Sequence, residues 1–247
     1  MPDNTAIEWT DATWNPVRGC GRVSEGCRHC YAETVAARFS NPGAPYHGFA
    51  DRTRSGSKWT GRVELLPQML DQPLRWRRRR RIFVNSMSDL FHESLPDDAI
   101  DAVFSIMAAA PQHTFQVLTK RPERMRVWLA RFRKSPADDG FVTRDGVRTN
   151  KLPKGEPIFN PERWPLPNVW LGVSVENQEA ADKRIPDLLN TCAAVRFISA
   201  EPLLGPLVLK QQNPDGFWPP QSVQPNMAWL RHKDWPDDFQ YWSTGLD

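Results

Sequence analysis

Residues 14–31 read WNPVRGCGRVSEGCRHCY and contain three of the four cysteines of the chain. Cys20, Cys27 and Cys30 follow the spacing Cys-x6-Cys-x2-Cys. A short segment before them, residues 12–15, is predicted to be a strand, and apolar residues at helical spacing follow them from Tyr31 to Phe39. The order strand, cysteine loop, helix predicts a loop that holds a metal cluster.

The rest of the chain repeats an alternation of short apolar runs and helical patterns. We predict strands at residues 62–65, 81–86, 114–119, 169–174 and 195–199, separated by helices at 67–77, 96–110, 124–133 and 178–189. Parallel neighbours need crossover connections, and continuous apolar strands are typical of a sheet that is covered on both faces. The expected fold class is therefore α/β, as a partial (β/α)6 TIM-like barrel of radical SAM type, although the pattern alone does not separate a barrel from an open sheet.

One domain is expected to span residues 1–209, with the cysteine loop at 20–30 and loop insertions near 40–60 and 135–167. Residues 210–247 carry Pro, Gln and Trp without a convincing periodic pattern, and we expect an irregular tail there.

Composition excludes several classes of protein. The net charge is +3 on 32 basic and 29 acidic residues, a balance that does not demand a polyanionic partner. The first ten residues lack the pattern of a signal peptide, and no apolar stretch approaches the ~20 residues needed to cross a bilayer. We therefore expect a cytoplasmic protein without a membrane partner. Four cysteines, three of them bunched, do not resemble a secreted disulfide framework and favour metal binding in a reducing compartment.

Ligand counting leaves two metals open. Structural zinc takes four protein ligands, and here the fourth would have to be His29, His47 or the distant Cys192, which we interpret as an ordinary buried thiol. A four-iron four-sulfur cluster held by three cysteines leaves one iron open to a substrate or cofactor.

Four further segments carry a resemblance to known proteins. They are residues 7–16 (IEWTDATWNP), 83–91 (FVNSMSDLF), 118–122 (LTKRP) and 198–203 (ISAEPL). Together with the cysteine loop they resemble a phage-encoded three-cysteine-motif family of unknown function. Cys27, Cys30 and the aromatic Tyr31, between a first strand and a first helix, are similar to the motif of the radical S-adenosylmethionine enzymes.

This resemblance implies that Cys20, Cys27 and Cys30 bind a 4Fe-4S cluster. It also implies that S-adenosyl-L-methionine binds the open iron and is reduced by an external electron donor to a 5′-deoxyadenosyl radical. The substrate is unknown and could be nucleic acid or a nucleotide. The first cysteine gap has six residues here, which is longer than the usual three. Relatives continue beyond a sequence like residues 245–247, so the resemblance also implies that this chain lacks its last strands.

The alternative is a non-enzymatic protein that is stabilised by zinc or by a cluster and binds nucleic acid, with the cysteines only folding the loop.

Polar residues follow the predicted strands, where barrel enzymes place their chemistry. A charge beside an apolar strand is costly unless it is used or paired, so the strongest catalytic candidates are Asp89, Lys120 and Glu201. The candidate cofactor-binding residues are Tyr31, Asn85, Ser86, Ser88, Ser174 and Glu176.

Residues 75–81 read RWRRRRR, the strongest charge feature of the chain. Such a run could bind phosphates, or it could complement the dipole at a helix C-terminus. The sequence leaves both interpretations open.

Overall fold

The computed structural model describes residues 5, 7–131, 164–209, 221–222 and 239–242, the last two stretches as backbone only. Its centre is a sheet of strands in the order β1-β6-β7-β8-β9-β12, in which every neighbouring pair is parallel. The strands are β1 (Ala12–Trp14), β6 (Arg81–Val84), β7 (Thr114–Thr119), β8 (Val169–Ser174), β9 (Val195–Ser199) and β12 (Phe239–Trp242). All their C-terminal ends therefore lie at one edge of the sheet.

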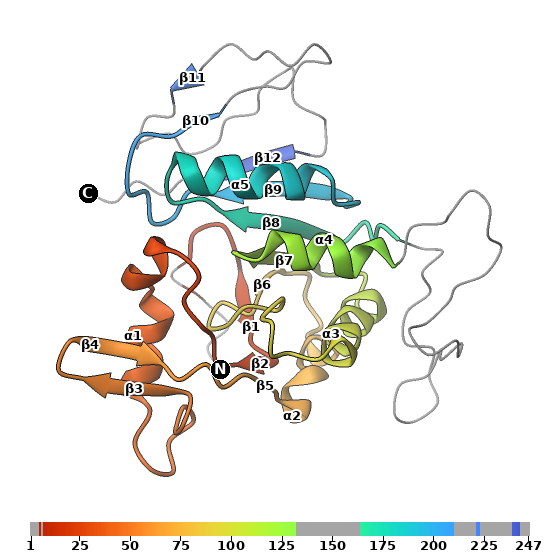
Figure 1. Ribbon diagram of the computed structural model, residues 1–247. Helices are drawn as coiled ribbons and strands as arrows, with labels where there is room; N and C mark the ends of the chain where they lie inside the picture. Colours follow the sequence, from red (N-terminus) through yellow and green to blue (C-terminus); the bar gives the residue numbers. More distant parts are fainter. Residues whose placement is uncertain (1–4, 6, 132–163, 210–220, 223–238, 243–247) are drawn as a thin grey trace.

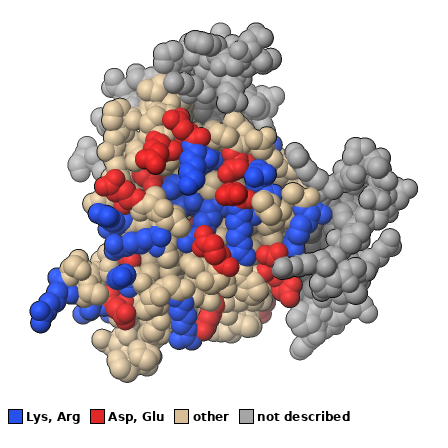
Figure 2. Space-filling model, viewed as in Figure 1, with Lys and Arg blue, Asp and Glu red and all other residues tan. Residues whose placement is uncertain are grey.

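Three helices cover one face of this sheet: α3 (Asp97–Ala109), α4 (Pro122–Ala130) and α5 (Gln178–Leu189) (Figure 1). Alternate strand residues such as Val84, Val117 and Val173 are fully buried in one cluster with Ile100 and Phe104 of α3. Complete burial of such side chains contributes roughly 1.5–3 kcal/mol each. The outer surface of this helical layer mixes both signs of charge (Figure 2), with ion pairs such as Arg126–Asp187 and Arg131–Asp101.

On the second face of the sheet a smaller aromatic cluster covers the middle of the strands. Trp9 lies with its ring centroid 4.7 Å from that of Phe83 and 6.4 Å from that of Phe197. Its carbonyl accepts a hydrogen bond from Nε2 of Gln116 at 3.3 Å. Gly172 leaves room for the Phe197 ring, because a Cβ there would lie 2.5 Å from it. The second face is therefore apolar where Trp9 covers it.

A small unit lies beyond the C-terminal edge of the sheet (Figure 1). It consists of α1 (Tyr31–Arg38) and the hairpin β3 (Ala50–Thr53) and β4 (Gly56–Trp59). Ala36, Phe49 and Trp59 form its buried centre. Before it, β2 (Val17–Arg18) pairs antiparallel with β5 (Glu64–Leu65).

The predicted parallel α/β architecture is confirmed, and β7, β8, β9 and α5 have the predicted bounds. Within the described residues the sheet does not close into a barrel, since β1 and β12 are its two edges. The strand predicted at 62–65 lies outside this sheet, because β5 pairs with β2 instead.

Three local predictions also differ from the structure. The hairpin β3–β4 lies within residues 40–60, where we expected a loop, and most of its side chains are exposed. The helix expected at 67–77 is two short pieces, α2 (Pro67–Leu70) and the 3-10 helix η2 (Gln72–Arg75). Pro73 has no N–H for the helical ladder and disfavours the α conformation of its predecessor. The alanines of α1 are buried, while two apolar residues of the predicted helical pattern, Val35 on α1 and Phe39 directly after it, are exposed.

The described parts of the predicted tail, residues 210–247, include strands that the sequence did not indicate. The short strands β10 (Val208–Leu209) and β11 (Gln221–Ser222) pair with each other, and β12 extends the main sheet beside β9. The expected insertion at 135–167 lies almost wholly outside the described residues. Within the described part of the chain, no helix combines the length and apolarity that a membrane span requires.

Candidate functional site

The predicted site residues gather around the C-terminal edge of the sheet, as parallel strands require. The cysteine loop follows β2 at this edge, and α1 begins directly after it (Figure 1). Gly19, at the start of the loop, forms a parallel bridge with Ser88 of the segment that follows β6. The cysteine loop and the ends of the central strands therefore form one region.

The three thiols of the loop are free and partly buried. Cys27 belongs to the 3-10 helix η1 (Glu25–His29), and Cys30 is the residue before α1. Cys20 and Cys30 both pack against the buried centre of the small unit. The guanidinium of Arg22, which is paired with Glu33 at 2.5 Å, interacts electrostatically with both Cys27 and Cys30.

Cys20 has the most perturbed environment of the three. Burial and, after it, the nearby Asp89 carboxylate raise the pKa of its thiol to about 12, against the opposing charge of Arg121. A metal cation reverses this balance, because coordination deprotonates a thiol.

By donor chemistry, the loop suits a metal that prefers sulfur ligands. Among the described residues, however, no three His, Cys, Asp or Glu side chains are already arranged as a metal site. His29 and His47 are exposed, and Cys192 follows α5 at the opposite edge of the sheet. Of the four free cysteines, only the three loop thiols therefore share one segment among the described residues, whereas Cys192 lies at the other edge of the sheet.

Asp89, a predicted catalytic residue, is buried and fully hydrogen-bonded. Its Oδ1 accepts from Thr119 Oγ1 at 2.7 Å and from the N–H of Phe91 at 2.9 Å. Its Oδ2 accepts from the N–H of Lys120 at 3.2 Å and from Arg121 Nη1 at 3.0 Å. With four donors bound to its two oxygens, the Asp89 carboxylate joins the segment after β6 to the end of β7.

Arg121, which the sequence reasoning missed, connects this anchor to the cysteine loop. Its Nη2 donates to the carbonyl of Gly21 at 3.1 Å, and its Nε donates to both oxygens of Glu93 at 2.8–2.9 Å. The only signal in the sequence is its place in LTKRP, directly after Lys120. Arg121 therefore positions the first half of the loop.

Glu176 contacts the second half of the loop. It is 1% exposed and pairs with Arg184, whose Nη1 lies 2.6 Å from Oε2. Burial alone would raise the pKa of Glu176, but hydrogen bonds from Arg184 and Ser24 outweigh burial and lower it. A Cβ on Gly26 would lie 3.0 Å from the Glu176 carboxyl carbon, so the loop packs directly on this side chain.

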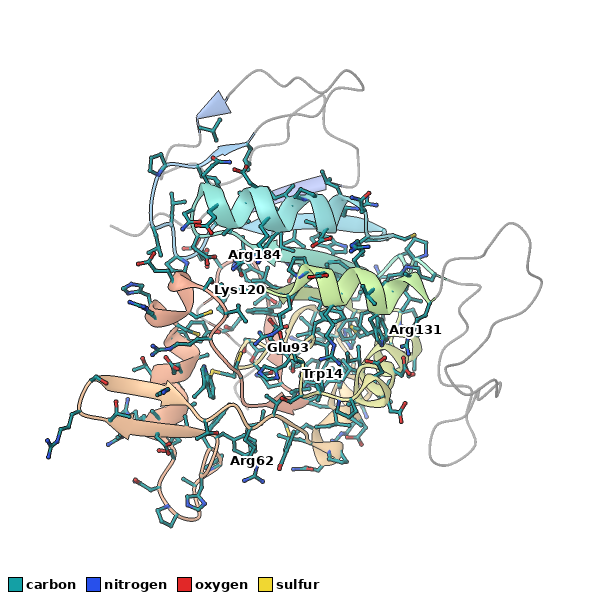
Figure 3. The ribbon with its side chains drawn as sticks, viewed as in Figure 1. Trp14, Arg62, Glu93, Lys120, Arg131 and Arg184 are labelled. Atoms are coloured by element: carbon teal, nitrogen blue, oxygen red, sulfur yellow. The ribbon has the colours of Figure 1, made fainter. Side chains whose placement is uncertain are left out.

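Lys120 and Glu201 complete the charged residues at this edge. Lys120 interacts electrostatically with Glu176, as does Arg184; Lys120 and Arg184 are labelled in Figure 3. Glu201 is half-buried and interacts electrostatically with Tyr31. The structure thus brings all three predicted catalytic residues to one edge of the sheet, where both carboxylate oxygens of Asp89 already accept hydrogen bonds.

Two buried polar atoms near this edge have no hydrogen-bond partner among the described residues: Asn85 Nδ2 and Ser199 Oγ. Asn85 follows β6 with φ 59°, and its Oδ1 accepts from the N–H of Val17 at 3.2 Å. Ser199 ends β9 in register with Ser174 of β8. Buried polar groups are normally satisfied, so such orphans are the kind of atoms that a bound ligand would pair.

The remaining cofactor-binding candidates hold the segments around the loop together. Tyr31 Oη donates to the carbonyl of Ser86 at 2.6 Å. Ser86 Oγ donates to Asn15 Oδ1 at 3.2 Å, and Ser88 Oγ donates to the carbonyl of Val17 at 3.0 Å. Their hydrogen bonds join α1, the β1–β2 connection and the segment after β6.

Comparison with known proteins identifies the family but no activity. A family model described as "protein of unknown function (DUF5131)" matches residues 4–230, so the chain belongs to this family. Neither the search of curated proteins nor the search of solved structures found a significant match.

Proposed function

We propose that this member of the DUF5131 family is an iron-sulfur protein of radical S-adenosylmethionine type. Cys20, Cys27 and Cys30 would hold the cluster, and a partial (β/α)6 TIM-like barrel would place the cofactor over the C-terminal ends of the strands. When bound, a 4Fe-4S cluster supplies the electron that cleaves S-adenosylmethionine reductively. The substrate class that we propose is a nucleotide or nucleic acid.

The observation that carries the proposal is the way the loop is held. Arg121 fixes the carbonyl of Gly21, and the buried Glu176 supports Gly26, so the segments after two different strands, β7 and β8, position the same loop. Neither contact uses a thiol. Two buried ion pairs, Arg121–Asp89 and Arg184–Glu176, therefore hold the loop with its three free thiols at the edge where parallel α/β proteins bind ligands.

The polar atoms at the C-terminal edge of the sheet are suited to a small polar ligand. Asn85 Nδ2 supplies a donor without a described partner, and Ser199 Oγ supplies a donor or an acceptor. Lys120 and Glu201 add one charge of each sign, which suits the carboxylate and the amino group of an amino-acid moiety. Orientation of the ligand, rather than proton transfer, is the role that we propose for these four residues.

One observation favours the alternative of a structural metal site. Asp89 and Glu176 are each paired with a buried arginine, so neither is available as a proton acceptor. A protein that used its metal only to fold the loop would have the same ion pairs.

The two proposals are separated by cofactor cleavage under anaerobic conditions. The reduced protein is incubated with S-adenosylmethionine, and 5′-deoxyadenosine is measured. The radical type predicts cleavage that is lost in Cys30→Ser and retained in Cys192→Ser, since Cys192 lies at the other edge of the sheet. A protein that holds a cluster without producing 5′-deoxyadenosine would be assigned the structural role.

A further inference from the structure

A second chemical feature lies at the N-terminal edge of the sheet, away from the cysteine loop. Residues 75–81, the arginine segment, run from the end of η2 to the first residue of β6. The N–H of Thr114, which starts β7, donates to the carbonyl of Arg80 and fixes the segment at this edge. The helix-dipole interpretation of the run does not apply beyond Arg75, because only the four-residue η2 precedes the segment.

The arginines of this segment divide into two groups. Arg75 pairs with Asp71 and Arg81 pairs with Asp11, while the guanidinium of Arg80 lies 5.0 Å from the ring centroid of Trp76. Arg77, Arg78 and Arg79 are exposed and form no ion pair with any described residue. Three adjacent cations therefore face solvent at this edge.

A hollow lies at the start of the arginine segment, lined in part by Arg75 and Trp76, the first two residues of the segment. It has a volume of about 370 Å³ and is lined by Gln68, Met69, Gln72, Arg75 and Trp76. Its size lies within the range of about 300–1,000 Å³ that is usual for ligand sites. Its lining combines an aromatic ring, a thioether and two side-chain amides, which together offer stacking and hydrogen bonds to one planar heterocycle.

We infer that the arginine segment and this hollow bind single-stranded nucleic acid. Arg77, Arg78 and Arg79 would contact successive phosphates, and the hollow would receive one unstacked base against Trp76. A single strand fits better than a duplex, because only an unpaired base can leave its stack to enter an aromatic hollow. The inference is independent of the metal, since the two features lie at opposite ends of β6.

Fluorescence anisotropy with labelled single-stranded DNA and RNA oligonucleotides, measured over a series of salt concentrations, tests this inference. The variant Arg77→Gln/Arg78→Gln/Arg79→Gln is compared with Arg38→Gln/Arg54→Gln/Lys58→Gln, which removes the same charge from exposed positions of α1 and the hairpin. The first variant should lose about tenfold or more in affinity, and its slope of log K against log salt should fall by about 2, at roughly 0.7 per phosphate contact. The control variant should keep the wild-type slope.

Three results would overturn the inference. Equal losses of affinity in both variants would show that net charge alone, and not the arginine segment, causes binding. Duplex binding as tight as single-strand binding would remove the role of the hollow. Binding to vesicles of anionic phospholipid, without binding to oligonucleotides, would make the segment a membrane-surface contact instead.

Trp76→Phe, which keeps a ring in place, should weaken single-strand binding and leave the salt slope unchanged.

Discussion

Arg121 Nη1 lies 3.0 Å from Asp89 Oδ2, and Nη2 of the same guanidinium donates to the carbonyl of Gly21 at 3.1 Å. One side chain thus joins the end of β7, the segment after β6 and the cysteine loop. The sequence segments FVNSMSDLF and LTKRP, which lie far apart along the chain, meet in this ion pair. We therefore interpret the buried charges of Arg121 and Asp89 as groups that position the loop rather than groups that transfer a proton.

Replacing Arg121 should destabilise the fold strongly, because it leaves the buried Asp89 carboxylate without its cation. We expect Arg121→Gln to lower the free energy of unfolding by about 3–5 kcal/mol in urea titrations. Arg131→Gln is the matched control. Its ion pairs with Asp97 and Asp101 are partly exposed, and removing such pairs costs about 0–1 kcal/mol. Equal losses in the two variants would show that the buried pair has no special role.

Glu176 should make stability depend on acid pH. The pKa of Glu176 is lowered in the folded protein by Arg184 and Ser24 against burial. The corresponding stabilisation is fully present above the ordinary pKa of the carboxyl, and it is lost as pH falls through the lowered folded value. Wild type and Glu176→Gln should therefore differ most in free energy of unfolding near pH 6 and converge towards pH 3. A difference that does not change with pH would exclude the ion pair as its cause.

Gly19 should be irreplaceable for the start of the cysteine loop. Its φ is +89°, and a Cβ there would lie 1.9 Å from the carbonyl oxygen of Arg62. Gly61 has a similar φ of +86° but open space around it. Gly61→Ala should cost only the backbone strain, about 1–3 kcal/mol, whereas Gly19→Ala should cost about 1–3 kcal/mol more because of the collision. Circular dichroism melts of both variants give the comparison, and equal costs would contradict the close approach to Arg62.

The sequence was most informative where apolar runs are continuous. β7, β8 and β9 have the predicted bounds because most of their residues are buried and many are β-branched or aromatic, as is typical of a covered parallel sheet. The hairpin β3–β4 escaped prediction because its residues, such as Asp51 and Lys58, show no apolar alternation. β12 escaped for a related reason, since no periodic pattern marks the chain around it.

At the candidate site, sequence reasoning located the edge but not the pairings. The expectation that buried charges are used or paired holds for Asp89 and Glu176, and both are paired. Their partners Arg121 and Arg184 could not be inferred, because only the folded chain brings residues from separate elements together. The unpartnered Nδ2 of Asn85 and Oγ of Ser199 likewise depend on packing that no local pattern encodes.

The metal content of the protein purified anaerobically tests the central claim most directly. Iron, acid-labile sulfide and zinc are measured for wild type, Cys192→Ser and the triple variant Cys20→Ser/Cys27→Ser/Cys30→Ser. Three-cysteine ligation of a 4Fe-4S cluster predicts about four irons and four sulfides per chain in the first two proteins and none in the third. One zinc per chain without iron, or iron that persists in the triple variant, would contradict the account.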